Sequence, residues 1–215
     1  MKNNELILRA ETRADWDEVE FLTREAFWDV YKPGCDEHLV VHTLRNDPAV
    51  IPELCVVAEL DGRIVGHIFY TRVRIAYDGG AHEAVAFGPI SVLPELQKQG
   101  VGSAMIKYTL PQAARMGFPG VLITGNPDYY HRFGFYDGAR HGIVMPDGSG
   151  GPWLMAQEFI PGALHSGCLH FAPQFDTDPA QLAEFETHFP AKEKKFPKLA
   201  IHPASVLSHW KACAG

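Results

Sequence analysis

The chain has 215 residues, 46% of them hydrophobic, which is enough for one domain with a sizeable core. Its formal charge of −7 and pI near 5.8 argue against a nucleic-acid-binding protein, which would carry a basic face. The four cysteines form no C-x-x-C pair, and we find neither an apolar signal core nor a membrane-spanning segment. We therefore expect a cytoplasmic protein without a membrane or nucleic-acid partner.

The first part of the chain predicts one strand and two helices. Residues 5–9 are apolar enough for a strand, and apolar residues then recur at helical spacing from 16 to 26. Pro33 and Gly34 end this helix, and residues 36–45 form a second short helix.

Three strands follow, over residues 54–59, 64–73 and 82–92. Asp61-Gly62 between the first two is typical of a tight hairpin turn, in which both residues need positive φ. The sequence thus predicts an antiparallel meander. Pro89 has no amide hydrogen, so we expect an interrupted or bulged ladder in the third strand.

The stretch 87–106, FGPISVLPELQKQGVGSAMI, is the one candidate for holding a cofactor. It predicts a strand, a loop containing Gly100 and Gly102, and the start of a helix. Glycines let the backbone approach a ligand, and free amides at a helix N-terminus attract phosphate. The loop lacks both the Walker pattern and the third glycine of the dinucleotide fingerprint, which favours a shorter pyrophosphate-binding loop.

The rest of the chain completes a mixed sheet. Pro111 should kink or restart the helix after the loop, and residues 121–124 predict a strand parallel to the one before it, through a right-handed crossover. Residues 153–160 and 167–171 predict two further strands. The fold class is therefore α/β, as an α+β mixed sheet with a meander, a βαβ crossover and helices on both faces.

Near residue 175 the sequence pattern changes from predicted strands to predicted short helices. Residues 179–189 and 204–212 predict short helices. We expect a domain over residues 1–175 and a helical C-terminal extension over 176–215, which packs on the domain or on a second subunit of a possible homodimer.

This order of elements resembles the GNAT acyl-CoA N-acyltransferases, and within them the YhbS-like branch of predicted N-acetyltransferases. The resemblance is carried by ISVLPELQKQGVGSAMI at 90–106 and DYYHRFGF at 128–135. The hairpin LDGRIVGHI at 60–68 and EFIPGAL at 158–164 support it. It covers residues 5–175, so the resemblance implies that this domain is a GNAT-like catalytic domain that binds acyl-CoA.

The resemblance implies acetyl-CoA, or another acyl-CoA, as co-substrate. The backbone of Ile90, Ser91 and Val92 would then pair with the pantetheine arm. Gln97 would steady the loop. The pyrophosphate would lie against the backbone amides of the loop, formed by Lys98, Gln99, Gly100, Val101, Gly102 and Ser103.

Tyr130 matches the tyrosine that many family members place beside the CoA sulfur, where it can protonate the leaving thiolate. The alternative is that Tyr129 and Tyr130 are packing aromatics. Many members have an asparagine seven residues before this tyrosine, whereas Asn126 is only four before it. A capping role for Asn126 is therefore an open alternative.

The general base and the acceptor site are less well defined. His82, Glu83 and Glu158 are candidate bases, each with the alternative of an exposed strand residue. His38 and His42 lie at i and i+4, but no third ligand accompanies them, so we expect no metal site. The resemblance places this region beside the acceptor pocket, so His38 and His42 are candidate substrate-binding residues. Glu83, on the strand that leads to the glycine loop, is a third candidate.

The sequence thus predicts an enzyme, an acyl-CoA-dependent N-acyltransferase that transfers groups other than amino-acyl groups. Transfer would be direct, from acetyl-CoA to the primary amine of a small molecule or a protein, in a ternary complex. Two alternatives stay open: a non-catalytic acyl-CoA-binding or sensing module, and transfer to a hydroxyl acceptor.

Overall fold

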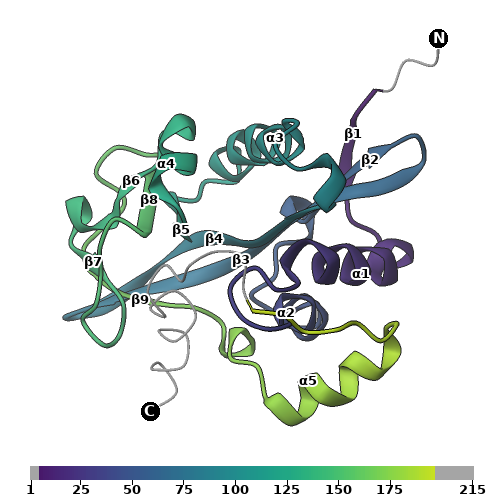
Figure 1. The fold of residues 1–215 in the computed structure, drawn as a ribbon. Helices are drawn as coiled ribbons and strands as arrows, with labels where there is room; N and C mark the ends of the chain where they lie inside the picture. The colour runs from purple at the N-terminus through teal and green to yellow at the C-terminus, as the bar shows by residue number, and fades with distance from the viewer. Residues whose placement is uncertain (1–4, 197–215) are drawn as a thin grey trace.

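A twisted sheet separates two groups of helices in the computed structural model, which describes residues 5–196 (Figure 1). The strands are β1 (Ile7–Ala10), β2 (Val56–Leu60), β3 (Arg63–Tyr77), β4 (Gly80–Val92), β5 (Gly120–Thr124), β6 (Tyr136–Asp137), β7 (Ile143–Val144), β8 (Leu154–Glu158) and β9 (Gly167–His170). The helices are α1 (Trp16–Phe27), α2 (Glu37–Leu44), α3 (Val101–Arg115), α4 (Pro127–Tyr130) and α5 (Pro179–Phe185).

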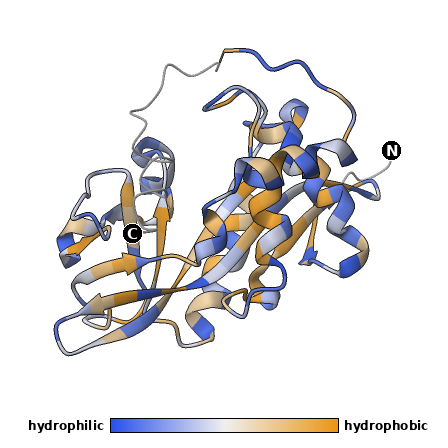
Figure 2. Cartoon of the chain, turned by 90° about the horizontal axis from the view of Figure 1, so that it is seen from below, coloured by the Kyte–Doolittle hydropathy of each residue, from blue (hydrophilic) through white to orange (hydrophobic). Residues whose placement is uncertain are grey.

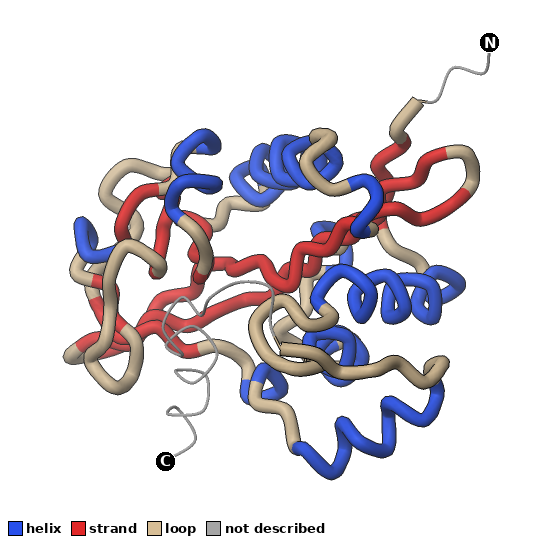
Figure 3. The backbone as a smooth tube through the Cα atoms, viewed as in Figure 1, coloured by secondary structure: helices blue, strands red, loops and turns tan. Residues whose placement is uncertain are grey.

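The sheet order is β1-β2-β3-β4-β5-β8-β6, and β9 pairs with both β3 and β7. Strands β1 to β4 form an antiparallel meander, whereas β4 and β5 are parallel and joined by α3. Figure 3 shows these strands in red between the blue helices. The predicted meander, crossover and mixed sheet are therefore confirmed.

Local turn chemistry fixes the register of the meander. Asp61 and Gly62 both have positive φ, at 53° and 79°, and connect β2 to β3 as predicted. The ladder between β3 and β4 shifts between Ile68 and Tyr70, opposite the Gly88–Pro89 step. The prediction that Pro89 interrupts the ladder is thus confirmed.

The hydrophobic core lies on both faces of the sheet. Helices α1 and α2 cover one face and α3 covers the other (Figure 1), and hydrophobic residues gather along the strands (Figure 2). Gly66 of β3 lets α3 approach closely, because a methyl group there would lie 2.9 Å from Val101 Cγ1.

Helix α3 runs without interruption through Pro111, so the predicted restart is wrong. Proline removes one helical hydrogen bond, which leaves the carbonyl of Lys107 without its partner. Both Lys107 and Pro111 are exposed, so water can satisfy this carbonyl at little cost.

Residues 176–196 lie along α2 and α1. The predicted helix over 179–189 is confirmed in part, because α5 ends at Phe185 and a 3₁₀ turn follows over Glu186–His188. The predicted helix at 204–212 lies outside the described residues, and the division of the chain at residue 175 stays a prediction. None of the described helices has the length and apolar character needed to cross a membrane.

Candidate active site

Strands β4 and β5 separate at the middle of the sheet. Their parallel pairing joins Val85 to Val121 and Ala86 to Leu122. Along residues 90–92, β4 is paired only with β3 within the described residues. The other edge of this strand end therefore offers backbone N–H and C=O groups to a ligand that contains amides.

The glycine loop connects this strand end to α3. Lys98 and Gly100 have positive φ, at 61° and 94°, and α3 begins directly afterwards at Val101. The first amides of a helix have no carbonyl partner within it, so they can bind an anion. The Gln97 side chain donates to the Val92 carbonyl at 3.1 Å and so ties the loop to the strand end.

Side chains at the strand end alternate between the two faces of the sheet. Ser91 is buried towards α1, where its hydroxyl donates to Thr23 Oγ1 at 3.1 Å. On the α3 side, a methyl group at Gly102 would lie 3.8 Å from Ile90 Cδ1 and 3.1 Å from the Tyr129 hydroxyl. A residue larger than glycine would therefore crowd the start of α3.

Tyr130 lies beside the opening between the two strands. Its ring packs on Phe87 of β4 and on Phe135, with centroids 6.0 and 5.8 Å apart. A methyl group at Gly125, directly after β5, would lie only 2.5 Å from Tyr130 Cε2. Burial raises the pKa of the Tyr130 hydroxyl, so this group stays protonated at neutral pH and can act as a proton donor.

Neighbouring residues hold the two tyrosines in place. The Asn126 side chain accepts a hydrogen bond from the Asp128 amide at 3.0 Å, so it caps α4. Tyr129 packs edge-on against Tyr130 at 4.9 Å, and the Arg132 guanidinium lies 4.6 Å from the centre of the Tyr129 ring. Tyr129 therefore faces the start of α3, whereas Tyr130 faces β4.

The three candidate bases lie away from this strand end and contact other residues. Glu83 is exposed near Arg72, seven residues before Ile90, or roughly 23 Å along the strand. His82 stacks edge-on with His165, and burial lowers its pKa. The Glu158 carboxylate accepts from the Leu164 amide at 3.0 Å, which lowers its pKa.

The two histidines of α2 face the C-terminal segment. His38 is 0% exposed, and its Nε2 lies 2.8 Å from Glu186 Oε1. His42 Nδ1 lies 3.0 Å from Glu20 Oε1, and its ring packs against Phe185. The structure thus brings His38 and His42 to Phe185 and Glu186, and contact with substrate stays a prediction. Across residues 5–196 we find no cluster of three His, Cys, Asp or Glu side chains that could hold a metal ion.

Tyr31, in the loop between α1 and α2, and Glu37, the first residue of α2, are two residues that the sequence analysis did not identify. The Tyr31 side chain is 48% exposed. Glu37 is 9% exposed; burial, and after it the charge of Asp36, raises its pKa to about 7. Neither residue belongs to a motif or a periodic pattern, so no sequence signal pointed to them.

Comparison with known proteins identifies the family. The sequence model of the acetyltransferase (GNAT) domain matches residues 8–137, more than half of the chain. The uncharacterized N-acetyltransferase YjhQ of Escherichia coli K12 is 32% identical over 96 residues, which span 45% of this chain but only 53% of YjhQ. The uncharacterized N-acetyltransferase YhbS of the same organism is 25% identical over 138 residues, covering 64% of this chain and 78% of YhbS.

Two crystal structures share the fold. A GNAT family acetyltransferase from Brucella melitensis in complex with acetyl-CoA has a TM-score of 0.67 and 29% identity, covering 81% of this chain and 100% of that one. YhbS from E. coli in complex with CoA has a TM-score of 0.72 and 22% identity, covering 81% and 94%. The splayed strands, the glycine loop and the family match agree: this chain belongs to the GNAT acetyltransferase family.

Proposed function

We propose that this protein transfers an acetyl group from acetyl-CoA to a primary amine by direct transfer in a ternary complex. The observation that carries the proposal is the position of Tyr130 beside the point where β4 and β5 separate. The acetyl-CoA in the related Brucella structure and the N-acetyltransferase names of the bacterial relatives support it.

The residues present fit this co-substrate. The unpaired edge of residues 90–92 matches the amides of pantetheine, and the start of α3 matches the pyrophosphate. Gln97, Lys98, Gln99, Gly100, Val101, Gly102 and Ser103 would form the phosphate-binding loop. Bound acetyl-CoA supplies a thioester, from which an amine forms an amide with loss of the CoA thiolate.

Two groups of the chain would assist this step. A backbone amide near Val92 would donate to the oxyanion as charge develops on the acetyl oxygen. Tyr130 would give its phenolic proton to the leaving sulfur, because its raised pKa keeps it protonated. The proton lost by the amine would go to solvent or to a base on the acceptor side.

The test begins with binding. We expect acetyl-CoA and CoA to raise the melting temperature, and a protein that neither stabilises would contradict the proposal. Release of free CoA thiol is then measured with a panel of polyamines, aminoglycosides, amino acids and peptide N-termini. Mass spectrometry would identify the product as an N-acetyl or an O-acetyl compound.

Tyr130→Phe should lower kcat by roughly 10²- to 10⁴-fold if Tyr130 is the proton donor, with little change in acetyl-CoA affinity. Tyr108→Phe is the matched control, because Tyr108 is an exposed tyrosine of α3. An unchanged kcat in Tyr130→Phe would remove Tyr130 from the reaction. Tight acetyl-CoA binding without turnover of any acceptor would instead favour the sensing module.

A further inference from the structure

Residues 186–196 run back along the α1–α2 layer after α5, beneath the sheet (Figure 1). They lie beyond residues 8–137, which match the GNAT domain. We refer to residues 186–196 as the C-terminal strap. Its contacts concentrate on α1 and on the loop of residues 28–36 that joins α1 to α2.

The main anchor of the C-terminal strap is Glu186. Its carboxylate accepts hydrogen bonds from Arg24 Nη2 at 2.8 Å and from Arg24 Nε at 3.1 and 3.2 Å, and it contacts His38 Nε2 at 2.8 Å. Arg24 is 2% exposed. A buried guanidinium needs a paired acceptor, and without Glu186 the nearest carboxylate left to Arg24 would be Glu25, 3.8 Å from its Nη1.

Two aromatic rings pack around this anchor, where the Glu186 side chain is 17% exposed. Phe185 and Phe189 pack on the His38 ring, with centroids 5.4 and 5.2 Å apart. Arg24 also donates to the Pro190 carbonyl at 3.2 Å, and its guanidinium lies 4.2 Å from the Trp28 ring centre. This enclosure strengthens the Glu186–Arg24 contact, because screening by water is weak there.

Further contacts join the C-terminal strap to the loop itself. The Trp28 indole donates to the Glu193 carbonyl at 3.0 Å, and Lys192 donates to Glu25 of α1 at 2.7 Å. Lys194 passes over the loop so closely that a methyl group at Gly34 would lie 3.0 Å from Lys194 Cε. The strap therefore fixes both ends of residues 28–36.

The same part of α1 reaches the reaction site. Arg24 follows Thr23, which accepts from Ser91 at the end of β4. Within the loop, the Asp29 carboxylate accepts from the Gly34 amide at 2.7 Å, so the loop is closed on itself and presents Tyr31 on its outer side. A displacement at Arg24 would thus move both Tyr31 and the packing behind Ser91.

We propose that Glu186 is a positioning residue for the acceptor side of the site, since it anchors the C-terminal strap and so holds the loop of residues 28–36 and the part of α1 that contacts Ser91. This inference rests on the proposed function. The position of the loop on the acceptor side would then depend on a segment that lies outside the residues matched to the GNAT domain.

The test compares the full-length protein with Glu186→Gln and Glu186→Asp, using the amine that turns over best in the panel. For Glu186→Gln we expect the acceptor KM to rise about tenfold, because small misplacements of a binding group have large effects, while the acetyl-CoA KM stays unchanged. Glu186→Asp keeps the charge and should recover part of the loss. Glu184→Gln, an exposed carboxyl on α5, is the matched control.

A readout independent of turnover is hydrogen exchange. Amides of residues 28–36 should exchange faster in Glu186→Gln, whereas those of the β2–β3 turn should not change. If Glu186→Gln fails to fold, Lys192→Gln removes a peripheral contact of the strap and should shift both readouts in the same direction.

Unchanged exchange at 28–36, or acceptor and acetyl-CoA KM values that rise together, would overturn the positioning role. Failure of the proposed function is distinguishable, because it appears in the wild type as absent acetyl-CoA binding or absent turnover.

Discussion

Glu37 carries a buried carboxyl at the first position of α2. Burial, and after it the charge of Asp36, raises its pKa from 4.5 to about 7. A raised carboxyl pKa stabilises the folded protein below pH 4.5, and this stabilisation is lost as the pH rises through 7. At about 1.4 kcal/mol per pKa unit, the loss is on the order of 3 kcal/mol.

Glu37→Gln should therefore raise the free energy of unfolding at pH 8, with a gain that shrinks as the pH falls to 4.5. Urea unfolding across this range measures the effect. Glu53→Gln is the control, because Glu53 is exposed on the turn before β2. A gain that is equal at pH 5 and pH 8 would show that the Glu37 charge is not its cause.

At this scale the sequence is informative where a motif constrains geometry. Gln97, Gly100 and Gly102 could be assigned to a loop because the strand before it and the helix after it are local features. The histidine pair of α2 was placed correctly on a helix, but its partners Phe185 and Glu186 lie more than 140 residues away. No local pattern encodes such a contact, so the surroundings of His38 could not be foreseen.

Among the elements, α3 couples the sheet to the glycine loop. Gly66 of β3 faces the first turn of α3, so Gly66→Ala would force its methyl group to within 2.9 Å of Val101 Cγ1 and 3.0 Å of Met105 Cε. The Met105 side chain can turn aside, but Val101 cannot move without its helix.

We expect Gly66→Ala to lower the free energy of unfolding by about 1–3 kcal/mol and to weaken acetyl-CoA binding, because the start of α3 shifts away from the sheet. Urea unfolding and calorimetric titration with acetyl-CoA measure the two effects. Gly150→Ala is the control, since the nearest atom to its added methyl group is 3.9 Å away. Destabilisation with unchanged affinity would mean that the loop does not depend on this contact.

Elements with strong local signals could be predicted, and those without them could not. The Asp61-Gly62 turn fixed the meander, and Pro89 marked the break in its ladder. The restart predicted at Pro111 was wrong, because helix propensity does not reveal that Lys107, whose carbonyl Pro111 leaves without a helical partner, is exposed. The strands β6 and β7 have two residues each, too short for any periodicity to appear.

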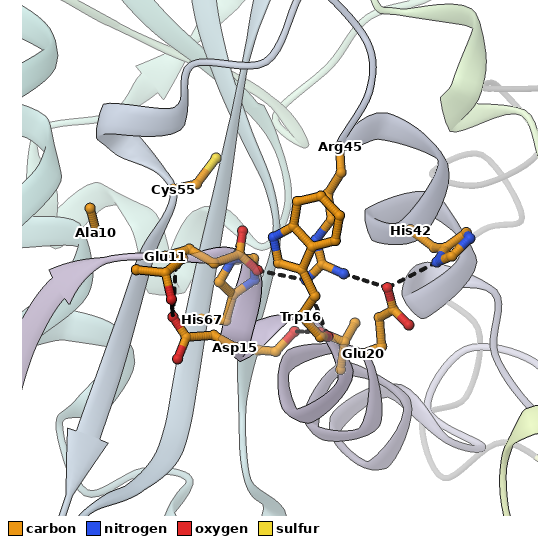
Figure 4. Close-up of polar contacts among 12 residues, drawn as sticks. Ala10, Glu11, Asp15, Trp16, Glu20, His42, Arg45, Cys55 and His67 are labelled. Atoms are coloured by element: carbon orange, nitrogen blue, oxygen red, sulfur yellow. Dashed lines mark hydrogen bonds and ion pairs between the residues drawn. The ribbon is translucent and has the colours of Figure 1, made fainter.

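In the whole molecule, a network of buried charges ties the first strand, both N-terminal helices and the sheet together (Figure 4). Arg45, after α2, donates to Glu11 at 2.6 Å and also to Glu20 of α1. Its guanidinium lies 4.9 Å from the Trp16 ring centre, and Glu11 Oε2 lies 3.6 Å from His67 Nε2 of β3. Burial alone would raise the pKa of Glu11, but His67 and Arg45 lower it.

A lowered carboxyl pKa contributes stability above the unfolded value, and this contribution is lost as the pH falls through the folded pKa. Arg45→Met should remove this stabilisation, because the buried carboxylates of Glu11 and Glu20 would lose the guanidinium that they share. We expect it to cost about 3–5 kcal/mol at neutral pH, with a smaller cost at pH 5 where the carboxylates can take up protons.

Urea unfolding of Arg45→Met and wild type at pH 5 and pH 7.5 tests this expectation. Arg63→Met is the matched control, because Arg63 forms an exposed ion pair with Glu95 at 3.4 Å, which should be worth about 1 kcal/mol or less. An equal cost of Arg45→Met at both pH values would assign the loss to its packing on Trp16 instead of its charge. The network would then hold α1 and α2 on the sheet by shape alone, and acid would not loosen the layer that carries Tyr31.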